Sequence, residues 1–283
     1  MADSCKETVK TIESSQVHEM LEEDKENLPL LVDVRQPEEY KEGHIPGALL
    51  VPLGQLEYGH PSFSKKKTMI TYCRSGKRSM TAAVILCKMG YSQVKSLEGG
   101  ILQWPYELVT GEPRPTLESD EIGTARELFL LALKKEIETW LFYRESKSNL
   151  DNPELVKVFE FLEGMEKDHM ETMYSRYSRT ARQMGEDVLP LAALREKYKE
   201  TFDRTRGDWD ELDDETEISL LESAVQREYQ KYDFYKLSVD HMEDNSLRVL
   251  LNELALEERA HASLLLKKIG QVKERKGKSM EEF

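Results

Sequence analysis

The sequence predicts two domains of different class: an α/β domain, then an all-α four-helix bundle with one long crossover. Its 283 residues are enough for about two domains of ordinary size. Short apolar runs alternate with helical patterns over the first hundred residues, whereas helical periodicity dominates from about residue 121. Between them, TGEPRPTLESD at residues 110–120 is rich in proline and lacks periodicity, as linkers do. We therefore expect domains at residues 1–112 and 121–275, a linker at 113–120 and a polar tail at 276–283.

The first domain shows the alternation of a parallel sheet covered by helices. Three runs are typical of buried strands: LPLLVDVR, TMITYC and VKSLEGG, the last ending in glycines. SMTAAVILCKMG is typical of a helix, closed by Gly90. Strands that alternate with helices imply βαβ units, so we expect a mostly parallel sheet.

Four amphipathic segments make up the second domain. They lie near residues 121–149, 152–180, 215–243 and 245–270. The gap between the second and third segments is long and can hold a short helix of its own. A bundle with one long crossover fits this layout, because helices that point the same way need a crossing segment between them.

Charge and cysteine usage narrow the function classes. The net charge is −14, of which residues 116–283 carry most, and this acidic balance disfavours a nucleic-acid partner. No apolar run is long enough to span a membrane, and the first residues show no secretory signal. Three cysteines without such a signal favour free thiols in a reducing, cytoplasmic location, with Cys87 a buried inert thiol.

The helical half is an internal duplication. A shift of 92 residues maps four residues of the first half onto four identical types in the second. The pairs are Glu136 and Glu228, Tyr143 and Tyr235, Glu166 and Glu258, and His169 and His261. Each half therefore carries one lone glutamate and one E-x-x-H motif, whose glutamate and histidine project to the same side of a helix.

Six of these residues fall on the apolar stripes of the four segments, which predicts a metal site. They are Glu136, Glu166, His169, Glu228, Glu258 and His261. Four ionised carboxylates in a bundle core are costly without counter-charge, and two metal ions supply that charge. A glutamate from each of two helices plus E-x-x-H from each of the other two is the di-iron or di-manganese carboxylate constellation. The alternative is a plain bundle with these side chains on its rim.

The segments LALKKEIETWLFY, FLEGMEKDHM, ESAVQREYQKYDFY and LNELALEERAH resemble the ferritin-like superfamily, and rubrerythrins most closely. The resemblance covers about residues 120–270 and implies that the six residues bind two iron ions, with manganese and zinc as alternatives. Rubrerythrins usually have a further glutamate where this chain has Lys231. They also carry a four-cysteine iron module, which this chain lacks, so an external electron donor is expected.

A cysteine loop marks the first domain. ITYCRSGKRSMTAA runs from a strand through Cys73 into a helix expected to begin near Ser79. Backbone N–H groups and the helix N-terminus at such a turn lower the pKa of a thiol and bind an anion or a persulfide. Arg74, Lys77 and Arg78 add positive charge, and Gly76 permits the tight curl.

The surroundings of this loop resemble the rhodanese family. LVDVRQPEEYKEGHIPGALLVPL, CRSGKRS and LEGGILQW match its signatures over about residues 8–110. The resemblance implies that Cys73 takes sulfane sulfur from a donor and passes it to a thiol acceptor. The site residues are expected to be Cys73, Arg74, Ser75, Gly76, Lys77 and Arg78, braced by Asp33 and Arg35. The C-x4-R spacing favours a sulfurtransferase over the related phosphatases with C-x5-R loops, and an inactive binding module is the alternative.

Together, these features predict a redox protein that combines sulfurtransferase activity through a Cys73 persulfide with a di-iron oxidase or peroxidase site. Its role would lie in sulfur metabolism or oxidative-stress defence. One alternative is an iron-binding ferroxidase protein with a rhodanese sensing module. Another is a non-catalytic docking module on a dimerising bundle. A homodimer is expected by analogy with ferritin-like bundles, and neither nucleic acid nor membrane is an expected partner.

Overall fold

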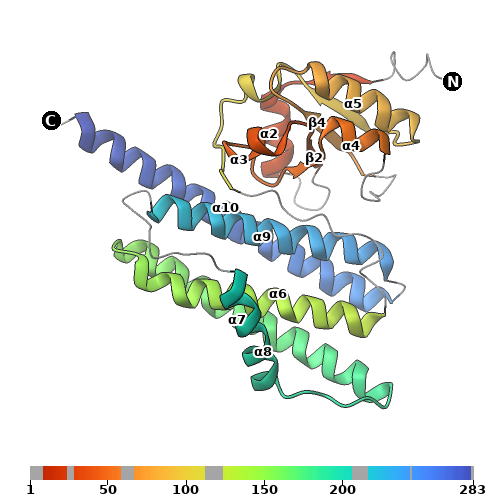
Figure 1. The fold of residues 1–283 in the computed structure, drawn as a ribbon, viewed down its shortest axis with the longest axis vertical. Coiled ribbons are helices and arrows are strands. Elements are labelled where there is room, and N and C mark those ends of the chain that lie inside the picture. The colour runs from red at the N-terminus through yellow and green to blue at the C-terminus, as the bar shows by residue number, and fades with distance from the viewer. Residues whose placement is uncertain are drawn as a thin grey trace. The chain divides into compact units, whose positions relative to one another are not determined.

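The computed structural model describes residues 9–23, 29–58, 67–111, 124–205, 216–242 and 244–281. The chain divides into two units, Met1–Ser119 and Asp120–Phe283 (Figure 1). The linker predicted at residues 113–120 lies outside the described residues.

A five-stranded sheet forms the centre of the first unit. Its strands are β1 (Lys10–Ile12), β2 (Leu30–Asp33), β3 (Leu49–Leu50), β4 (Met69–Tyr72) and β5 (Val94–Leu97). Their order is β1-β5-β4-β2-β3, and every pairing is parallel, as the sequence predicts. β2 and β4 are buried at every residue, which explains their continuous apolar runs.

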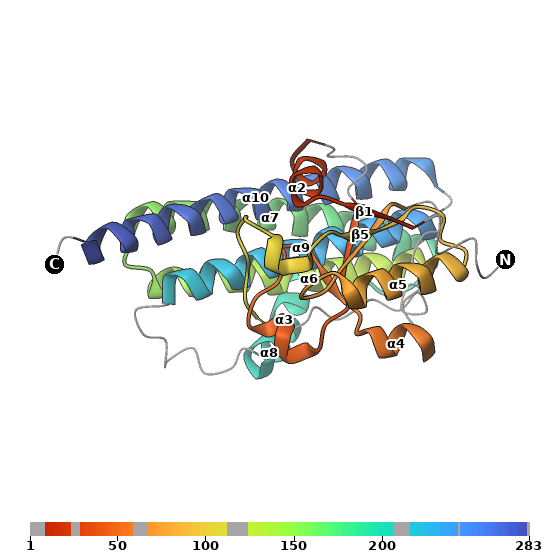
Figure 2. The ribbon, with the colours of Figure 1, turned by 90° about the horizontal axis from the view of Figure 1, so that it is seen from above.

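Helices cover both faces of this sheet. They are α2 (Ser14–Glu23), α3 (Pro37–Lys41), α4 (Leu53–Tyr58) and α5 (Lys77–Lys88), with a 3₁₀ turn at Gly100–Gln103. Along β2, side chains alternate between the two faces. Leu30 and Val32 join the core under α4 and α5, whereas Leu31 joins the core with Val17 of α2. Figure 2 shows α2 on one side of β1 and β5, and α4 and α5 on the other.

One cysteine differs from expectation. Cys87 lies on α5, is half-buried, and is disulfide-bonded. The prediction that it is a buried inert thiol is therefore wrong. The helix places it beside the apolar core but at the edge, where the side chain is partly exposed.

Four long helices pack side by side in the second unit. They are α6 (Ala125–Ser146), α7 (Pro153–Gln183), α9 (Thr216–His241) and α10 (Asn245–Glu281). α6 packs along α7, α9 packs along α10, and α6 also contacts α9 (Figure 1). α7 and α10 begin 92 residues apart, so the duplication in the sequence is also a duplication of helices.

Local sequence sets where these helices begin. Thr124 and Glu127 form a reciprocal capping box at the start of α6. Asn152 accepts a hydrogen bond from Glu154 N at the start of α7, and Pro153 occupies the first helical position. The segment between α7 and α9 holds the short helix α8 (Leu191–Thr205), which packs against α6.

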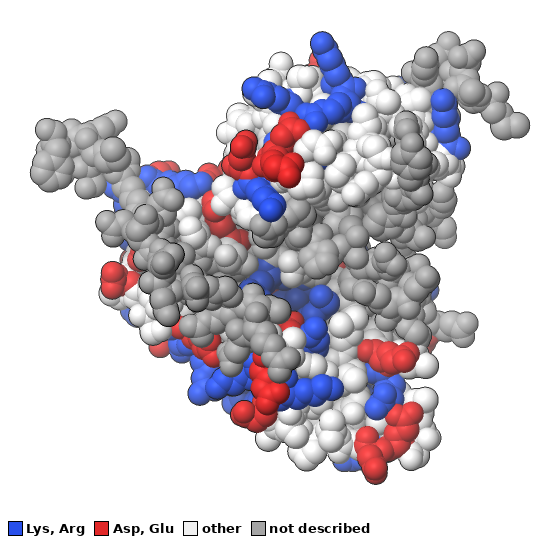
Figure 3. Space-filling view, in the orientation of Figure 1, with Lys and Arg blue, Asp and Glu red and all other residues white. Residues whose placement is uncertain are grey.

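Three further features concern the last helix, the hydropathy of the helices and the surface charge. α10 continues to Glu281, so the predicted polar tail at residues 276–283 is helical as far as that residue. Among the described residues, none of the helices combines the length and hydropathy that a bilayer crossing requires. On the face shown in Figure 3, Lys and Arg side chains are interspersed with Asp and Glu rather than gathered in one basic patch.

The turn after β5 approaches the cysteine loop closely. Gly100 has φ +63°, in the left-handed region that favours glycine. A Cβ at this position would lie 2.3 Å from the backbone oxygen of Cys73. The same oxygen accepts a hydrogen bond from Ile101 N at 2.8 Å, which fixes the two turns together.

We predict that Gly100→Ala lowers the free energy of unfolding of the first unit by about 2 kcal/mol or more, because backbone strain adds to an overlap that only backbone movement can relieve. Chemical denaturation followed by tryptophan fluorescence measures the change. Gly54→Ala in α4 is the control, since nothing lies within 4 Å of its Cβ position. Its effect should stay within about 1 kcal/mol of zero. Equal effects of the two substitutions would contradict the prediction.

Candidate functional sites

The first candidate site is the loop between β4 and α5. Cys73 follows the last residue of β4 and is 1% exposed, while Arg74, Ser75 and Lys77 are exposed around it. Gly76 has φ +89° and turns the chain into α5, which begins at Lys77, two residues earlier than the sequence predicts. The loop therefore puts a thiol at the positive end of a 12-residue helix.

Hydrogen bonds lower the pKa of this thiol. Burial acts to raise it, but hydrogen bonds from Ser79, Ser75 and Gly76 outweigh burial, so the pKa of Cys73 lies below its usual value. Gly76 N donates to Cys73 Sγ at 3.2 Å. Ser79 is itself fixed: its hydroxyl lies 2.9 Å from that of Ser96 and donates to Gly76 O at 3.1 Å. The loop stabilises a thiolate or another anionic sulfur at this point.

Arg78 is held next to the sulfur by a carboxylate. Its two terminal nitrogens donate to the two oxygens of Glu39, each at 2.7 Å, in a bidentate pair. These hydrogen bonds raise the pKa of Arg78, and the charge of Cys73 raises it further, so Arg78 and the sulfur are electrostatically coupled. Arg78 in turn lowers the pKa of Glu39 to about 2. Sequence reasoning missed Glu39, which lies 39 residues away.

Asp33 and Arg35 form a buried brace beneath the loop. Arg35 Nε and Nη2 donate to Asp33 at 2.7–3.0 Å, and Nη2 also donates to Gly43 O at 2.7 Å. The guanidinium lies 5.8 Å from the ring centre of Tyr72, the residue before Cys73. Both charged groups are at most 5% exposed, so the pair connects the end of β2 to the end of β4 and does not face solvent.

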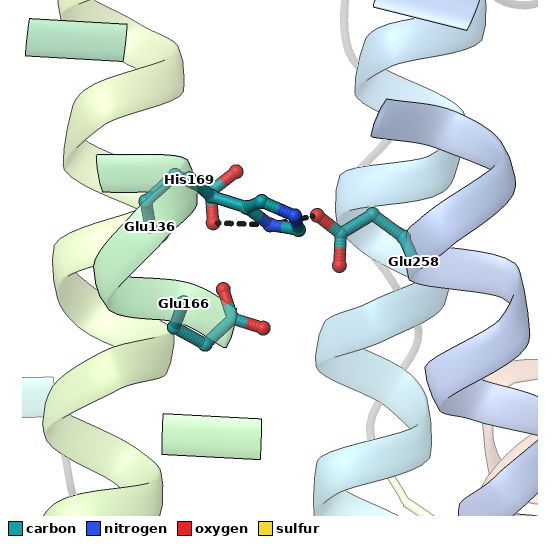
Figure 4. A group of neighbouring side chains, drawn as sticks. All are labelled: Glu136, Glu166, His169 and Glu258. Atoms are coloured by element: carbon teal, nitrogen blue, oxygen red, sulfur yellow. Dashed lines mark ion pairs between the residues drawn. The ribbon is translucent and has the colours of Figure 1, made fainter. Parts of the chain in front are cut away.

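The second candidate site is a cluster of six buried side chains in the helical unit. Glu136 comes from α6, Glu166 and His169 from α7, Glu228 from α9, and Glu258 and His261 from α10. The side chains form two groups, each with donor atoms within 4.8 Å of one another. One group is Glu136, Glu166, His169 and Glu258; the other is Glu166, Glu228, Glu258 and His261. Figure 4 shows the first group converging from three helices.

Two glutamates belong to both groups. Glu166 and Glu258 are shared, whereas Glu136 with His169 and Glu228 with His261 each belong to one group. His169 Nδ1 lies 3.1 Å from Glu258 Oε1 and 3.8 Å from Glu136 Oε2 (Figure 4). The two groups are therefore adjacent and have two carboxylates in common.

Several buried atoms of the cluster make ion-pair contacts but no hydrogen bond of good geometry. They are Glu166 Oε1, His169 Nδ1, Glu228 Oε2, both carboxylate oxygens of Glu258, and His261 Nδ1. Buried polar atoms without such partners are rare in proteins. Carboxylate oxygens and imidazole nitrogens are ligands for iron, manganese and zinc, so the residues present fit a pair of such ions.

Two tyrosines tie the lone glutamates across the bundle. Tyr143 of α6 donates to Glu228 of α9, and Tyr235 of α9 donates to Glu136 of α6. Both rings are fully buried. The 92-residue shift pairs these two tyrosines in the sequence, and the structure adds their hydrogen bonds to the glutamates. On the other side of the cluster, His169 Nε2 lies 2.7 Å from Glu257, which orients the ring so that Nδ1 faces the glutamates.

Positive charge in the cluster comes from three side chains. Burial acts to lower the pKa of Lys231, but the four glutamates raise it well above its usual value. Burial likewise opposes protonation of His169, yet Glu136 and Glu258 raise its pKa to about 12. Glu228 and Glu258 raise the pKa of His261 to about 9 in the same way. Sequence reasoning noted Lys231 as a departure but did not place it within the cluster.

Comparisons with known proteins concern the first unit. The rhodanese-like domain family matches residues 13–106. A sulfurtransferase of Allochromatium vinosum is 41% identical over 75 residues, which cover 26% of this chain and 70% of that protein. The Bacillus subtilis protein YtwF is 35% identical over 107 residues, which cover 38% of this chain and 96% of YtwF. A solved rhodanese-like domain protein of Staphylococcus aureus is 30% identical, with a TM-score of 0.34, over 37% of this chain and all of that one.

The parallel sheet, the cysteine loop and the match to the family model together define an α/β domain of rhodanese type. Through this first unit, the chain belongs to the rhodanese-like family, which confirms the first half of the fold prediction. The second unit is helical.

We predict that Cys73 is alkylated by iodoacetamide with a pH midpoint below that of a free cysteine, since the thiolate is the reacting form and the loop lowers its pKa. Ser79→Ala removes one of the hydrogen bonds responsible, so its midpoint should rise. Thr81→Ala, on the exposed side of the same helix, should leave the midpoint unchanged. Mass spectrometry of the Cys73 peptide across pH gives each midpoint. Coincident midpoints for all three proteins would contradict the assigned role of the loop.

Proposed function

We propose that this protein is a sulfurtransferase whose second unit carries a two-metal carboxylate site. The single observation that supports the first part best is the thiol of Cys73, held at a helix N-terminus by three hydrogen-bonding residues. The sulfurtransferase relative from Allochromatium vinosum supports the same activity. The presence of the cysteine and of Arg78 beside it favours an active domain over a binding module.

The proposed reaction has two sulfur-transfer steps. The Cys73 thiolate attacks the outer sulfur of a sulfane donor such as thiosulfate; a new S–S bond forms and sulfite leaves with the electron pair of the old bond. The resulting persulfide is anionic, and the backbone N–H groups of the loop hold that charge. An acceptor thiolate then attacks the outer sulfur, the Cys73 thiolate leaves, and the loop is restored. Arg74, Lys77 and Arg78 draw the anionic donor towards the loop.

We predict that Cys73→Ser abolishes transfer of sulfur from thiosulfate to a thiol acceptor, with a loss of about 10³-fold or more in rate, because the nucleophile itself is removed. Release of sulfite and formation of the acceptor persulfide are the two products to measure. Thr81→Ala should retain full activity. Equal rates in Cys73→Ser and the unchanged protein would exclude Cys73 as the sulfur carrier.

The second part of the proposal is that the helical unit is a ferritin-like bundle of rubrerythrin type. Its support is the convergence of four glutamates and two histidines from four helices, with buried donor atoms that lack hydrogen bonds. The residues that would hold the two ions are Glu136, Glu166, His169, Glu228, Glu258 and His261. Two iron ions bound there would supply electron transfer to peroxide or dioxygen.

The protein's own groups would position that chemistry. Tyr143 and Tyr235 hold Glu228 and Glu136 by hydrogen bonds, so each terminal carboxylate keeps a fixed orientation. Glu257 does the same for His169. The six residues of the cluster are at most 5% exposed, which limits the access of water to them. The external electron donor and the homodimer stay predictions.

We predict that the chain binds two iron ions after growth with iron. Variants of the cluster should bind fewer. Glu166→Ala should lose both ions, because this carboxylate belongs to both groups, whereas Glu136→Ala should lose mainly one. Glu163→Ala is the control, since this residue pairs with Lys147 outside the cluster and its loss should leave metal content unchanged. Elemental analysis of the full chain gives the stoichiometry. No bound metal in the unchanged protein would overturn this part of the proposal.

A further inference from the structure

The two halves of the helical unit differ at a buried position beside the cluster. A shift of 92 residues maps Lys231 of α9 onto Thr139 of α6, and both side chains are buried. Lys231 follows Glu228 by three residues, so the two project to the same side of α9. A buried lysine needs a counter-charge, and its position next to a lone glutamate directs its stem into the cluster.

The ammonium of Lys231 reaches all four glutamates of the cluster. Nζ lies 2.6 Å from Glu258 Oε2 and 3.3 Å from both Glu136 Oε2 and Glu228 Oε2. It also forms an ion pair with Glu166 Oε2. One oxygen of every carboxylate in the cluster is therefore directed at a single cation that belongs to the chain itself.

Those carboxylates are the groups that metal ions would use. Glu166 and Glu258 are common to both candidate groups, and both bind the ammonium. A metal ion held by these two carboxylates would lie within a few ångströms of the ammonium, and like charges repel strongly in a buried site of low polarity. The same oxygens cannot serve both cations at full strength.

From this geometry we infer that Lys231 and divalent metal ions are alternative occupants of the carboxylate cluster. The inference rests on the proposed metal site. In the metal-free chain the ammonium holds the four glutamates together and keeps the bundle folded. Binding of a first-row divalent cation such as Fe²⁺ or Mn²⁺ displaces the ammonium, and the flexible four-carbon stem of lysine allows it to withdraw. Lys231 therefore weakens metal affinity and stabilises the metal-free state.

The test compares metal binding in the full chain after removal of metals by chelation. Lys231→Met removes the cation, and Lys231→Gln keeps a polar donor without the charge, in case the first variant folds poorly. Lys147→Met is the control: it removes the same charge from an ion pair with Glu163 outside the cluster. Calorimetric titration with Mn²⁺, with electron paramagnetic resonance to count bound ions, gives affinity and stoichiometry.

The expected result is Mn²⁺ binding about tenfold or more tighter in both Lys231 variants than in the unchanged protein, with Lys147→Met unaltered. Thermal unfolding at 222 nm supplies the second readout. Without metal, the Lys231 variants should melt about 5 °C or more lower, because buried carboxylates have lost their partner, and excess Mn²⁺ should restore the loss.

The outcomes separate this inference from the function on which it rests. Equal or weaker Mn²⁺ binding in the Lys231 variants would overturn alternative occupancy but leave the metal site standing. Unchanged melting of the metal-free variants would also overturn it, since the ammonium would then hold nothing together. If neither the unchanged protein nor any variant bound Mn²⁺, and if the protein grown with iron contained no bound metal, the metal site itself would be overturned.

Discussion

The need to neutralise four buried carboxylates governs the second half of this molecule. Glu136, Glu166, Glu228 and Glu258 have no exposed surface, and an isolated charge in such a place would be strongly unfavourable. Neighbouring side chains supply the positive charge and the hydrogen bonds that stabilise them. Lys231 pairs with all four, two histidines face them, and two tyrosines donate hydrogen bonds to the outer pair. Because the carboxylates come from four different helices, the same interactions that neutralise them also determine how those helices pack.

The first unit must also stabilise a buried negative charge, but it has a single one at its site and uses hydrogen-bond donors. Its site must stabilise one buried negative sulfur, and the hydrogen bonds that lower the pKa of Cys73 come from donors at a helix N-terminus. The fully buried charges in this unit, Asp33 and Arg35, neutralise each other directly. The pair then serves as a structural connection between the ends of β2 and β4. The chain therefore contains two sites for anionic chemistry, one built on dipoles and one on charges.

Sequence reasoning reached most of this arrangement where the signal was local or repeated. β2, β4 and β5 appear as apolar runs, and the six residues of the cluster appear through the 92-residue shift. It missed β1 and β3, of three and two residues, because such short strands have no periodicity and form only by pairing with neighbours. It also missed Glu39 beside Arg78, and it could not place the ammonium of Lys231, whose long side chain reaches carboxylates on three other helices. Such contacts depend on tertiary structure, which no local pattern encodes.

The crosswise tyrosine bonds have a consequence for how the bundle comes apart. Tyr143 and Glu136 lie on α6, and their partners Glu228 and Tyr235 lie on α9, so each helical hairpin both gives and receives a buried hydrogen bond. If one hairpin opened alone, a tyrosine and a carboxylate in each half would lose their hydrogen-bond partners. Partial unfolding of this unit is therefore disfavoured relative to complete unfolding, and we expect the two hairpins to unfold together as one cooperative unit.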